Sequence, residues 1–309
     1  MYRKLFLLFV LFFIILPGQA LTFRYGGMDR TYFIHVPECY DSNNKTPLVI
    51  ALHGGGGLAK RMEHFTRFDE LSEKENFIVV YPQGYKRQWN DGREAASIPA
   101  QELNIDDVGF INALIDTLYS QYNIDSSRIY VTGLSNGGFM TTRIGCELGN
   151  RIAAIAPMIS TLPKKLNTKC NPVKAMPVML INGTDDPLVP YDGGFVRVGR
   201  KTRGEILSTD ETIEFWIQVD QCTTKPDIIK IEDKDKTDDC TATAYIYPDG
   251  AEDSEVVLIK VNGGGHTIPG GRQYLPKGII GNVCRDFIAE ELILEFFKNH
   301  PKNTDMSQH

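Results

Sequence analysis

The stretch that decides the fold is "VTGLSNGGFM", Val131–Met140, which carries the pattern G-x-S-x-G centred on Ser135. An apolar run before Ser135 indicates a buried strand, and "NGGFMTTRIGCEL" after it indicates a helix. A serine at such a sharp strand-to-helix turn needs glycines beside it, because side chains at Gly133 and Gly137 would crowd the crossing. The pattern alone also fits a structural glycine-rich turn, so the rest of the chain has to decide.

Strands and helices alternate along most of the chain. Two short strands joined at Gly26-Gly27 predict an antiparallel hairpin. We expect buried strands in "PLVIALHGGGG", "FIVVYPQG", "SRIYVTGLS", "IAAIAPMIS", "PVMLINGTDD", "ATAYIYP" and "SEVVLIKVNGGGH". We expect helices in "DELSEKEN", "DDVGFINALIDTLYSQYN", "NGGFMTTRIGCEL", "STDETIEFWIQVDQC" and "VCRDFIAEELILEFFKNH". This alternation predicts one domain over residues 21–300, a mostly parallel sheet with helices on both faces.

The chemistry-bearing residues follow these predicted strands. Open parallel sheets bind ligands at the carboxyl ends of their strands. The predicted strands lead in chain order into a glycine loop (residues 54–57), Ser135, Asp185-Asp186 and His266. The order serine, acid, histidine is that of the α/β-hydrolase fold, in which the serine occupies a nucleophile elbow. We therefore predict an α/β-hydrolase with a catalytic triad.

The predicted roles follow from this arrangement. His266 would take the proton of Ser135 as general base, and Asp186 would orient the imidazole. The N–H groups of Asn136 and Gly55 would form the oxyanion hole. For the acid, Asp185 and Asp192 remain alternatives to Asp186.

Other histidines and other cofactors are weaker candidates. His53 precedes the glycine loop and fits a structural hydrogen-bonding role, and His35, His64 and His300 lack a comparable loop position. The chain has no H-E-x-x-H motif and no Gly-Lys-Ser/Thr after its glycines, so we expect neither a catalytic metal nor a nucleotide phosphate. Trp89, in the irregular polar segment 85–104, is either a substrate platform or a core anchor.

Composition excludes several classes of protein. Of the 309 residues, 42% are hydrophobic and 23% charged, and the net charge of −6 offers no basic surface for nucleic acid. Residues 1–20, "MYRKLFLLFVLFFIILPGQA", combine Arg3 and Lys4 with a short apolar run and small residues near Ala20, which is typical of a cleaved signal peptide. An uncleaved anchor is the alternative. We expect a secreted or periplasmic protein that does not remain in the membrane, with a polar tail at 301–309.

Six cysteines in an exported chain predict disulfides. Cys222 and Cys240 flank a strongly polar segment, which favours that pair first. Cys146 with Cys170 is the second choice.

Several blocks together resemble a known family. They are "PLVIALHGGGG", "FIVVYPQG", "DDVGFINALID", "RIYVTGLSNGGFM", "NGTDDPLVPYDGG" and "NGGGHTIPGG". In this order they are similar to the secreted polyhydroxybutyrate depolymerase and feruloyl esterase group, close to carbohydrate esterase family one. The resemblance implies a serine esterase without a cofactor, with Ser135, Asp186 and His266 as its triad. It also implies a supporting, substrate-side role for Asp107 and a disulfide at Cys222. Ile268 stands where the group has an aromatic residue, which we expect to remove a ring-stacking partner beside His266.

The predicted function is hydrolysis of carboxylic esters through an acyl-enzyme. The expected substrate is a hydroxyalkanoate ester, preferably a soluble oligomer. Feruloyl or acetyl esters on plant polysaccharide are the alternative. A non-catalytic binding protein on a hydrolase scaffold is the rival from another class.

Overall fold

The computed structural model describes residues 19–302. The predicted signal peptide therefore lies almost entirely outside the described residues, as does most of the tail from residue 301. Within residues 19–302, no helix is both long and apolar enough to cross a membrane.

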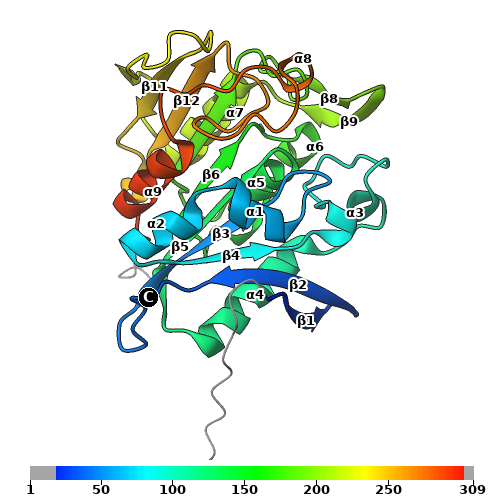
Figure 1. Cartoon of the computed structure of the whole chain (residues 1–309), viewed down its shortest axis with the longest axis vertical. Coiled ribbons are helices and arrows are strands. Elements are labelled where there is room, and N and C mark those ends of the chain that lie inside the picture. Colours follow the sequence, from blue (N-terminus) through cyan, green and yellow to red (C-terminus); the bar gives the residue numbers. More distant parts are fainter. Residues whose placement is uncertain (1–18, 303–309) are drawn as a thin grey trace, which may run out of the picture.

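A ten-stranded sheet forms the centre of the described chain, in the order β1-β2-β4-β3-β5-β6-β7-β12-β11-β10 (Figure 1). The six strands from β4 to β12 in this order run parallel, and the two strands at each edge pair antiparallel. The strand bounds are β1 (Leu21–Tyr25), β2 (Met28–His35), β3 (Thr46–Leu52), β4 (Ile78–Pro82), β5 (Ile124–Leu134), β6 (Ala154–Met158), β7 (Val178–Gly183), β10 (Asp227–Lys230), β11 (Thr241–Tyr247) and β12 (Val256–Asn262). A separate hairpin consists of β8 (Gly194–Val198) and β9 (Lys201–Ile206).

Helices cover both faces of the sheet. The helix bounds are α1 (Ala59–Phe65), α2 (Phe68–Glu75), η1 (Tyr85–Arg87), α3 (Pro99–Glu102), α4 (Asp107–Gln121), α5 (Asn136–Leu148), α6 (Lys164–Asn167), α7 (Thr209–Asp220), η2 (Ala251–Asp253), α8 (Lys277–Ile280) and α9 (Ala289–Asn299). Figure 1 shows α1, α2 and α9 together on one face, with α4, α5 and α7 on the other. This arrangement confirms the predicted α/β-hydrolase architecture.

Side-chain alternation along β3 shows how the two faces are filled. Leu48, Ile50 and Leu52 join the apolar cluster under α4, α5 and α7. Val49 and Ala51 join the cluster under α1, α2 and α9. All five are fully buried. A strand buried on both faces needs an unbroken apolar run, which is why "LVIAL" predicts it so clearly.

Local signals place the helix starts. The Asp106 carboxylate accepts a hydrogen bond from the Gly109 N–H and so caps the start of α4. Ser208 caps α7 through a capping box with Glu211. The sequence predicts neither α1, the edge strand β10 and the β8–β9 hairpin nor the short helices α3, α6, α8, η1 and η2.

The cysteines differ from the first prediction. Cys146 and Cys170 form a disulfide, which confirms the second choice. Cys222 and Cys240 are unpaired and buried, so the pair expected first is wrong. The physical reason is that Cys222 packs into the apolar cluster on one face of the sheet and Cys240 into the cluster on the other.

We predict that Cys146→Ala/Cys170→Ala lowers the melting temperature by about 5 °C. The disulfide closes a loop with a sequence separation of 24 residues. Removing it returns roughly 3 kcal/mol of chain entropy to the unfolded state. Differential scanning calorimetry of the oxidised protein measures the shift. Cys39→Ala, which removes an exposed free thiol, is the matched control. An equal melting temperature for wild type and double variant would contradict the prediction.

Candidate active site

Ser135 lies at a strained turn between β5 and α5. Its backbone has φ 55° and ψ −118°, a combination that residues other than glycine rarely adopt. The Ser135 N–H donates to the Met158 carbonyl at 3.0 Å, and the Ser135 carbonyl accepts from the Phe139 N–H at 2.9 Å. These bonds to β6 and to the first turn of α5 hold the unusual conformation in place.

Two glycines allow this turn to form. A Cβ added to Gly137 would lie 2.3 Å from the Leu52 carbonyl oxygen, and one added to Gly133 would lie 2.6 Å from the Gly137 carbonyl oxygen. Neither contact is sterically possible without backbone movement. The glycines of the G-x-S-x-G pattern thus let α5 begin directly against the end of β3, as the sequence predicts.

His266 and Asp186 form a buried pair at the carboxyl ends of β12 and β7. His266 Nδ1 and Asp186 Oδ2 are 2.6 Å apart. The other carboxylate oxygen of Asp186 accepts the N–H groups of Leu188 and Val189, both at 2.8 Å. Asp186 is therefore fixed by backbone donors while it faces the imidazole.

The alternative acids do not occupy this position. Asp185 is exposed, and its carboxylate accepts a hydrogen bond from the neighbouring Thr184 hydroxyl. Asp192 is also exposed. Thr184 and Asp185 form a turn directly after β7, and Asp186, which follows it, is the aspartate whose carboxylate contacts His266.

The loop that carries His266 is anchored on both sides. The His266 N–H donates to the Ile280 carbonyl at 2.6 Å, and the Tyr274 hydroxyl donates to the His266 carbonyl at 2.8 Å. His266 itself is 4% exposed. Its backbone is thus held by a segment that follows it in sequence, between β12 and α9.

A cavity of about 400 Å³ brings most of the predicted site residues together. Ser135, His266, Gly55 and Asn136 all line it. Its remaining lining is largely apolar and includes Leu58, Met62, Phe65, Leu134, Leu188, Val196, Val198, Tyr274 and Leu275. The sequence analysis missed Arg61, Arg93 and Arg203, which line the same cavity. Their only sequence signal is the polar character of the segments that carry them.

Some backbone N–H groups near the cavity donate hydrogen bonds within the protein, whereas others have no such acceptor. Asn136 is the first residue of α5, so its N–H has no acceptor within the helix. In the glycine loop, the Gly56 N–H donates to the Arg87 carbonyl and the Gly57 N–H to the Gly54 carbonyl. A Cβ added to Gly55 would lie 3.5 Å from Asn136 Cβ, so the two residues are neighbours across the cavity wall.

Trp89 is not a substrate platform. It is fully buried and absent from the cavity lining, and its indole N–H donates to the His53 carbonyl at 2.9 Å. The Asn136 side chain also accepts the Trp89 N–H at 2.8 Å. Trp89 is therefore a core anchor that ties the segment 85–104 to the elbow.

Asp107 also lies outside the cavity, so the predicted contact with substrate is wrong. It is fully buried, pairs with Arg30 at 2.6 Å and accepts the Asn90 N–H at 2.7 Å. Burial raises the pKa of Asp107, and the Arg30 charge opposes that shift. Asp107 supports the loop behind the site, as the family resemblance implies.

His53 lines the cavity as a neutral, structural side chain. Burial lowers the pKa of His53 to about 4. Its Nε2 accepts the Gly84 N–H at 3.0 Å, and its Nδ1 lies 2.8 Å from the Gly54 carbonyl, which it can reach only as a donor.

Ile268 is 2% exposed within an apolar cluster and does not line the cavity. Ile268 therefore offers no side chain for ring stacking in the cavity.

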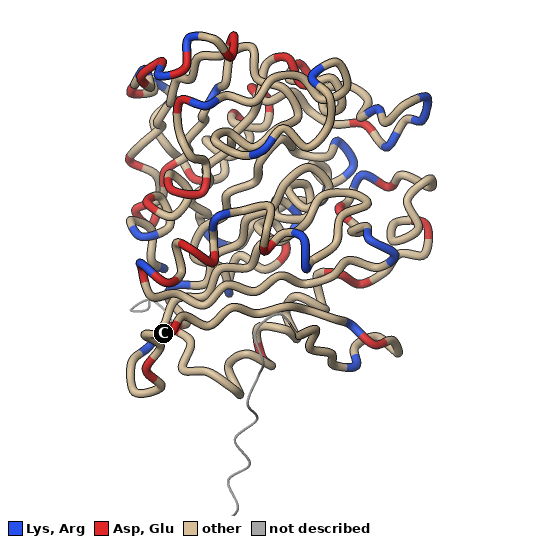
Figure 2. Tube along the Cα trace, viewed as in Figure 1, with Lys and Arg blue, Asp and Glu red and all other residues tan. Residues whose placement is uncertain are grey.

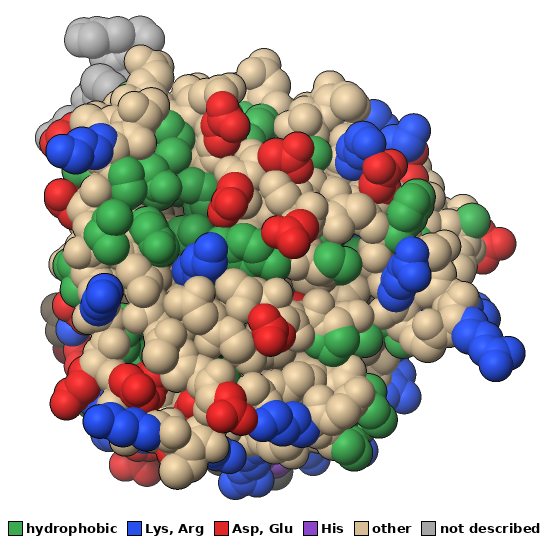
Figure 3. Space-filling view, turned by 90° about the horizontal axis from the view of Figure 1, so that it is seen from above, with side chains coloured by type: hydrophobic (Ala, Val, Ile, Leu, Met, Phe, Trp, Pro, Cys, Tyr) green, Lys and Arg blue, Asp and Glu red, His purple; other side chains and the backbone are tan. Residues whose placement is uncertain are grey.

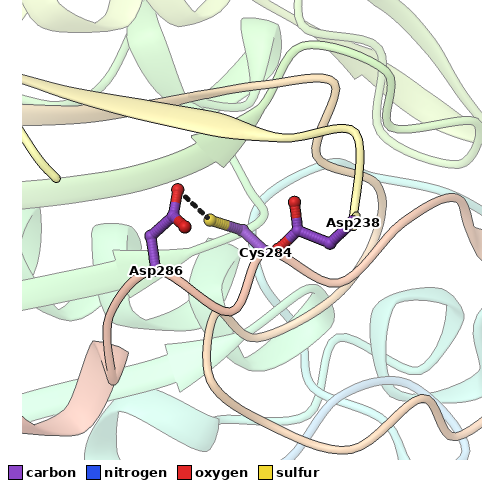
Figure 4. A group of neighbouring side chains, drawn as sticks. All are labelled: Asp238, Cys284 and Asp286. Carbon is purple, nitrogen blue, oxygen red and sulfur yellow. Dashed lines mark hydrogen bonds between the residues drawn. The ribbon is translucent and has the colours of Figure 1, made fainter. Parts of the chain in front are cut away.

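One group of the described residues has the composition of a metal site. Asp238, Cys284 and Asp286 lie together away from the cavity, with the thiol of Cys284 directed toward Asp286 (Figure 4). Their carboxylates are already engaged by backbone donors. Asp286 accepts the N–H groups of Lys234 and Asp235, and Asp238 accepts those of Cys240 and Arg285. The group organises the polar segment that precedes β11.

The chain is similar to proteins named as esterases over most of its length. NocK of Nocardia uniformis subsp. tsuyamanensis, whose assignment as an esterase is provisional, is 26% identical over 88% of this chain and 80% of its own. Feruloyl esterase B of Piromyces equi is 28% identical over 77% of this chain. The match spans only 42% of that relative's own length.

Solved structures share the fold. Acetyl xylan esterase from Aspergillus awamori has a TM-score of 0.56 at 16% identity, and covers 87% of this chain and 94% of its own. The native structure of pOPH has a TM-score of 0.56 at 14% identity, with 94% and 89% covered. The phospholipase/carboxylesterase family model matches residues 39–197, just over half of the chain. This match, with the elbow inside it, shows that the chain is a carboxylic ester hydrolase that belongs to the phospholipase/carboxylesterase family.

Proposed function

We propose that Ser135 is the nucleophile of an exported serine esterase, with His266 as general base and Asp186 as the acid that orients it. The observation that carries the assignment is the shared geometry. The strained Ser135 turn and the His266–Asp186 pair meet at one cavity, at the carboxyl ends of β5, β7 and β12.

Acylation uses these groups in order. The Ser135 hydroxyl oxygen attacks the ester carbonyl carbon, and its proton moves to His266 Nε2. The Asp186 carboxylate accepts the Nδ1–H of His266 and stabilises the imidazolium that forms. The oxyanion is held by the N–H groups of Asn136 and Gly55, since the Gly56 N–H already donates to the Arg87 carbonyl and the Gly57 N–H to the Gly54 carbonyl. The imidazolium then protonates the leaving alcohol, and an acyl group remains on Ser135.

Deacylation follows the same steps, with a water molecule as the nucleophile in place of Ser135. His266 takes a proton from a water molecule, whose oxygen attacks the acyl carbonyl. The second tetrahedral intermediate collapses, the proton returns to Ser135, and the carboxylic acid leaves.

The substrate class follows from the cavity. Its mostly apolar wall suits the acyl chain or ring of a small ester. We propose hydroxyalkanoate esters as substrates, with feruloyl or acetyl esters of plant polysaccharide as the second candidate. The feruloyl esterase among the relatives favours the second candidate. Export is supported by the sequence of residues 1–20 and by the Cys146–Cys170 disulfide.

A fluorophosphonate probe tests the nucleophile. We expect one adduct, located by mass spectrometry on the peptide that contains Ser135, and none in Ser135→Ala. The same variant should lose about 10⁵-fold or more in kcat on a 4-nitrophenyl ester, because the acyl-enzyme cannot form. Circular dichroism controls for folding. An adduct on another residue of the folded wild type would reject the assignment.

The two neighbouring aspartates provide a matched pair of variants. Asp186→Asn should lower kcat by roughly 10³–10⁴-fold, because an amide cannot stabilise the His266 imidazolium and favours the wrong tautomer. Asp185→Asn should stay within about twofold of wild type, since its carboxylate is exposed and bonds to Thr184, whereas Asp186 holds His266. Steady-state kinetics on a neutral ester compare the two. Equal losses in both variants would show that the inward-facing position of Asp186 is not what matters.

A further inference from the structure

The cavity is positively charged although the protein is not. Its lining contains Arg61, Arg93 and Arg203, and within residues 19–302 no aspartate or glutamate lines it. The chain as a whole carries 39 acidic and 33 basic residues. Figure 3 shows acidic and basic side chains interspersed over the face that it displays. The excess of arginine over acidic residues is thus specific to the cavity lining and is not a property of the whole protein.

Arg93 is electrically compensated. Its Nε and one terminal nitrogen donate to Asp91 Oδ2 at 2.9 and 2.6 Å, and its guanidinium stacks 4.3 Å from the centre of the Phe139 ring. Both side chains of the Arg93–Asp91 pair are buried. This pair leaves no net charge for a ligand.

Arg203 has no such partner. Its Nε is buried without a hydrogen-bond acceptor, and no ion pair joins it to any carboxylate of the described chain. Burial lowers the pKa of Arg203, and the like charge of Arg93 lowers it further. A guanidinium remains charged under these conditions. Its uncompensated charge at the cavity wall would be offset by an anion.

The hairpin holds Arg203 at the cavity. Val196 of β8 and Ile206 of β9 pack with Phe139 and Val189 in an apolar cluster. Gly204, with φ +91°, lets β9 approach the Arg93 segment, because a Cβ there would lie 2.7 Å from Arg93 Cβ. Figure 2 shows the hairpin β8–β9 projecting from the body with basic residues along it. Arg203 is the arginine of this hairpin that lines the cavity, whereas Arg200 is exposed at its tip.

We propose that Arg203 binds a carboxylate on the substrate, so that the preferred substrates are esters that carry a second, free carboxylate in their acyl or alcohol part. The inference rests on the proposed function, and narrows its substrate class. An arginine pairs with a carboxylate through parallel N–H bonds, which gives both affinity and orientation. A hydroxyalkanoate oligomer ends in a free carboxylate, whereas methyl ferulate and an acetyl group on xylan do not. Arg203 thus favours the first candidate substrate over the second.

Two matched substrate pairs test the inference. Monomethyl adipate against methyl adipamate places the charge in the acyl part, and 4-acetoxybenzoate against 4-acetoxybenzamide places it in the alcohol part. Each pair differs only in carboxylate against amide. We expect wild type to favour the anionic member of at least one pair by about 10–100-fold in kcat/KM, the range of a charge-assisted hydrogen bond. The pair that shows the preference identifies which part of the ester carries the charge.

Three variants separate the role of Arg203 from general effects of charge. Arg203→Gln should abolish the preference, because kcat/KM for the anionic ester should fall to the value for its neutral partner. Arg203→Lys, which keeps the charge but loses the planar fork, should retain part of it. Arg200→Gln, the same charge change at the exposed hairpin tip, should retain all of it.

Three results would overturn the inference: no preference in either pair, a preference that survives in Arg203→Gln, or an equal loss of anionic and neutral substrates in that variant. Binding of adipate and benzoate, with their amides as controls, to Ser135→Ala by calorimetry gives a readout that needs neither turnover nor a stable Arg203 variant. Tighter binding of an acid than of its amide supports the inference, and equal binding contradicts it. Turnover of neutral esters without a preference would refute the anion site alone, while no turnover of any ester would refute the proposed esterase.

Discussion

The conformation of Ser135 is the constraint on which the rest of the structure depends. A positive φ at a residue with a side chain is unfavourable, and it persists because β3, β5, β6 and the start of α5 meet around it. The contact between the Gly137 segment and the Leu52 carbonyl leaves no room for a Cβ. The same crossing places Asn136, the first residue of α5, at the cavity wall. The arrangement of the strands around this turn therefore fixes the positions of the proposed nucleophile, Ser135, and of one proposed oxyanion donor, Asn136.

The segment behind the elbow explains how this strain is supported. The Asn136 side-chain amide accepts a hydrogen bond from the Trp89 N–H and donates to the Trp89 carbonyl. It also donates to the Asp91 carboxylate. Asp91 in turn holds Arg93, and Asp107 holds the N–H of Asn90. A continuous buried polar network therefore runs from the elbow to the hairpin-facing wall of the cavity. In a low-dielectric interior such a network is stable only when each member is paired, which makes the unpaired Arg203 beside it significant.

The sequence predicted what short-range physics determines. An unbroken apolar run such as that of β3 is favourable only where both faces of the strand are buried. Gly133 and Gly137 are needed because a Cβ at either position would collide with neighbouring backbone, and the G-x-S-x-G pattern alone predicts this. Order along the chain predicted that Ser135, an acid and His266 follow strands of one sheet, and the structure places Ser135 and His266 at one cavity with Asp186 bound to His266. Asp185 remained an alternative to Asp186, because the turn after β7 decides which of the two carboxylates contacts His266.

The sequence did not predict features that arise from contacts between distant segments. Cys222 and Cys240 looked like partners across a polar segment, yet the sheet separates them. Trp89 lies in a polar stretch but is fully buried, since His53 and Asn136 satisfy its N–H groups. Few side chains of the β8–β9 hairpin are buried, so its sequence lacks the apolar alternation that would predict strands. The sequence therefore gave no indication that Arg203 lies at the cavity.

The central claim is that catalysis proceeds through an acyl group on Ser135. Rapid quenching of wild type during turnover of 4-nitrophenyl acetate, followed by intact and peptide mass spectrometry, tests it most directly. The account predicts a burst of 4-nitrophenol and a transient single acetyl increment, located on the peptide that contains Ser135, which decays as substrate is exhausted. Steady turnover with no acetyl increment on Ser135 at any time, or an increment on another residue that forms and decays at the turnover rate, would contradict it.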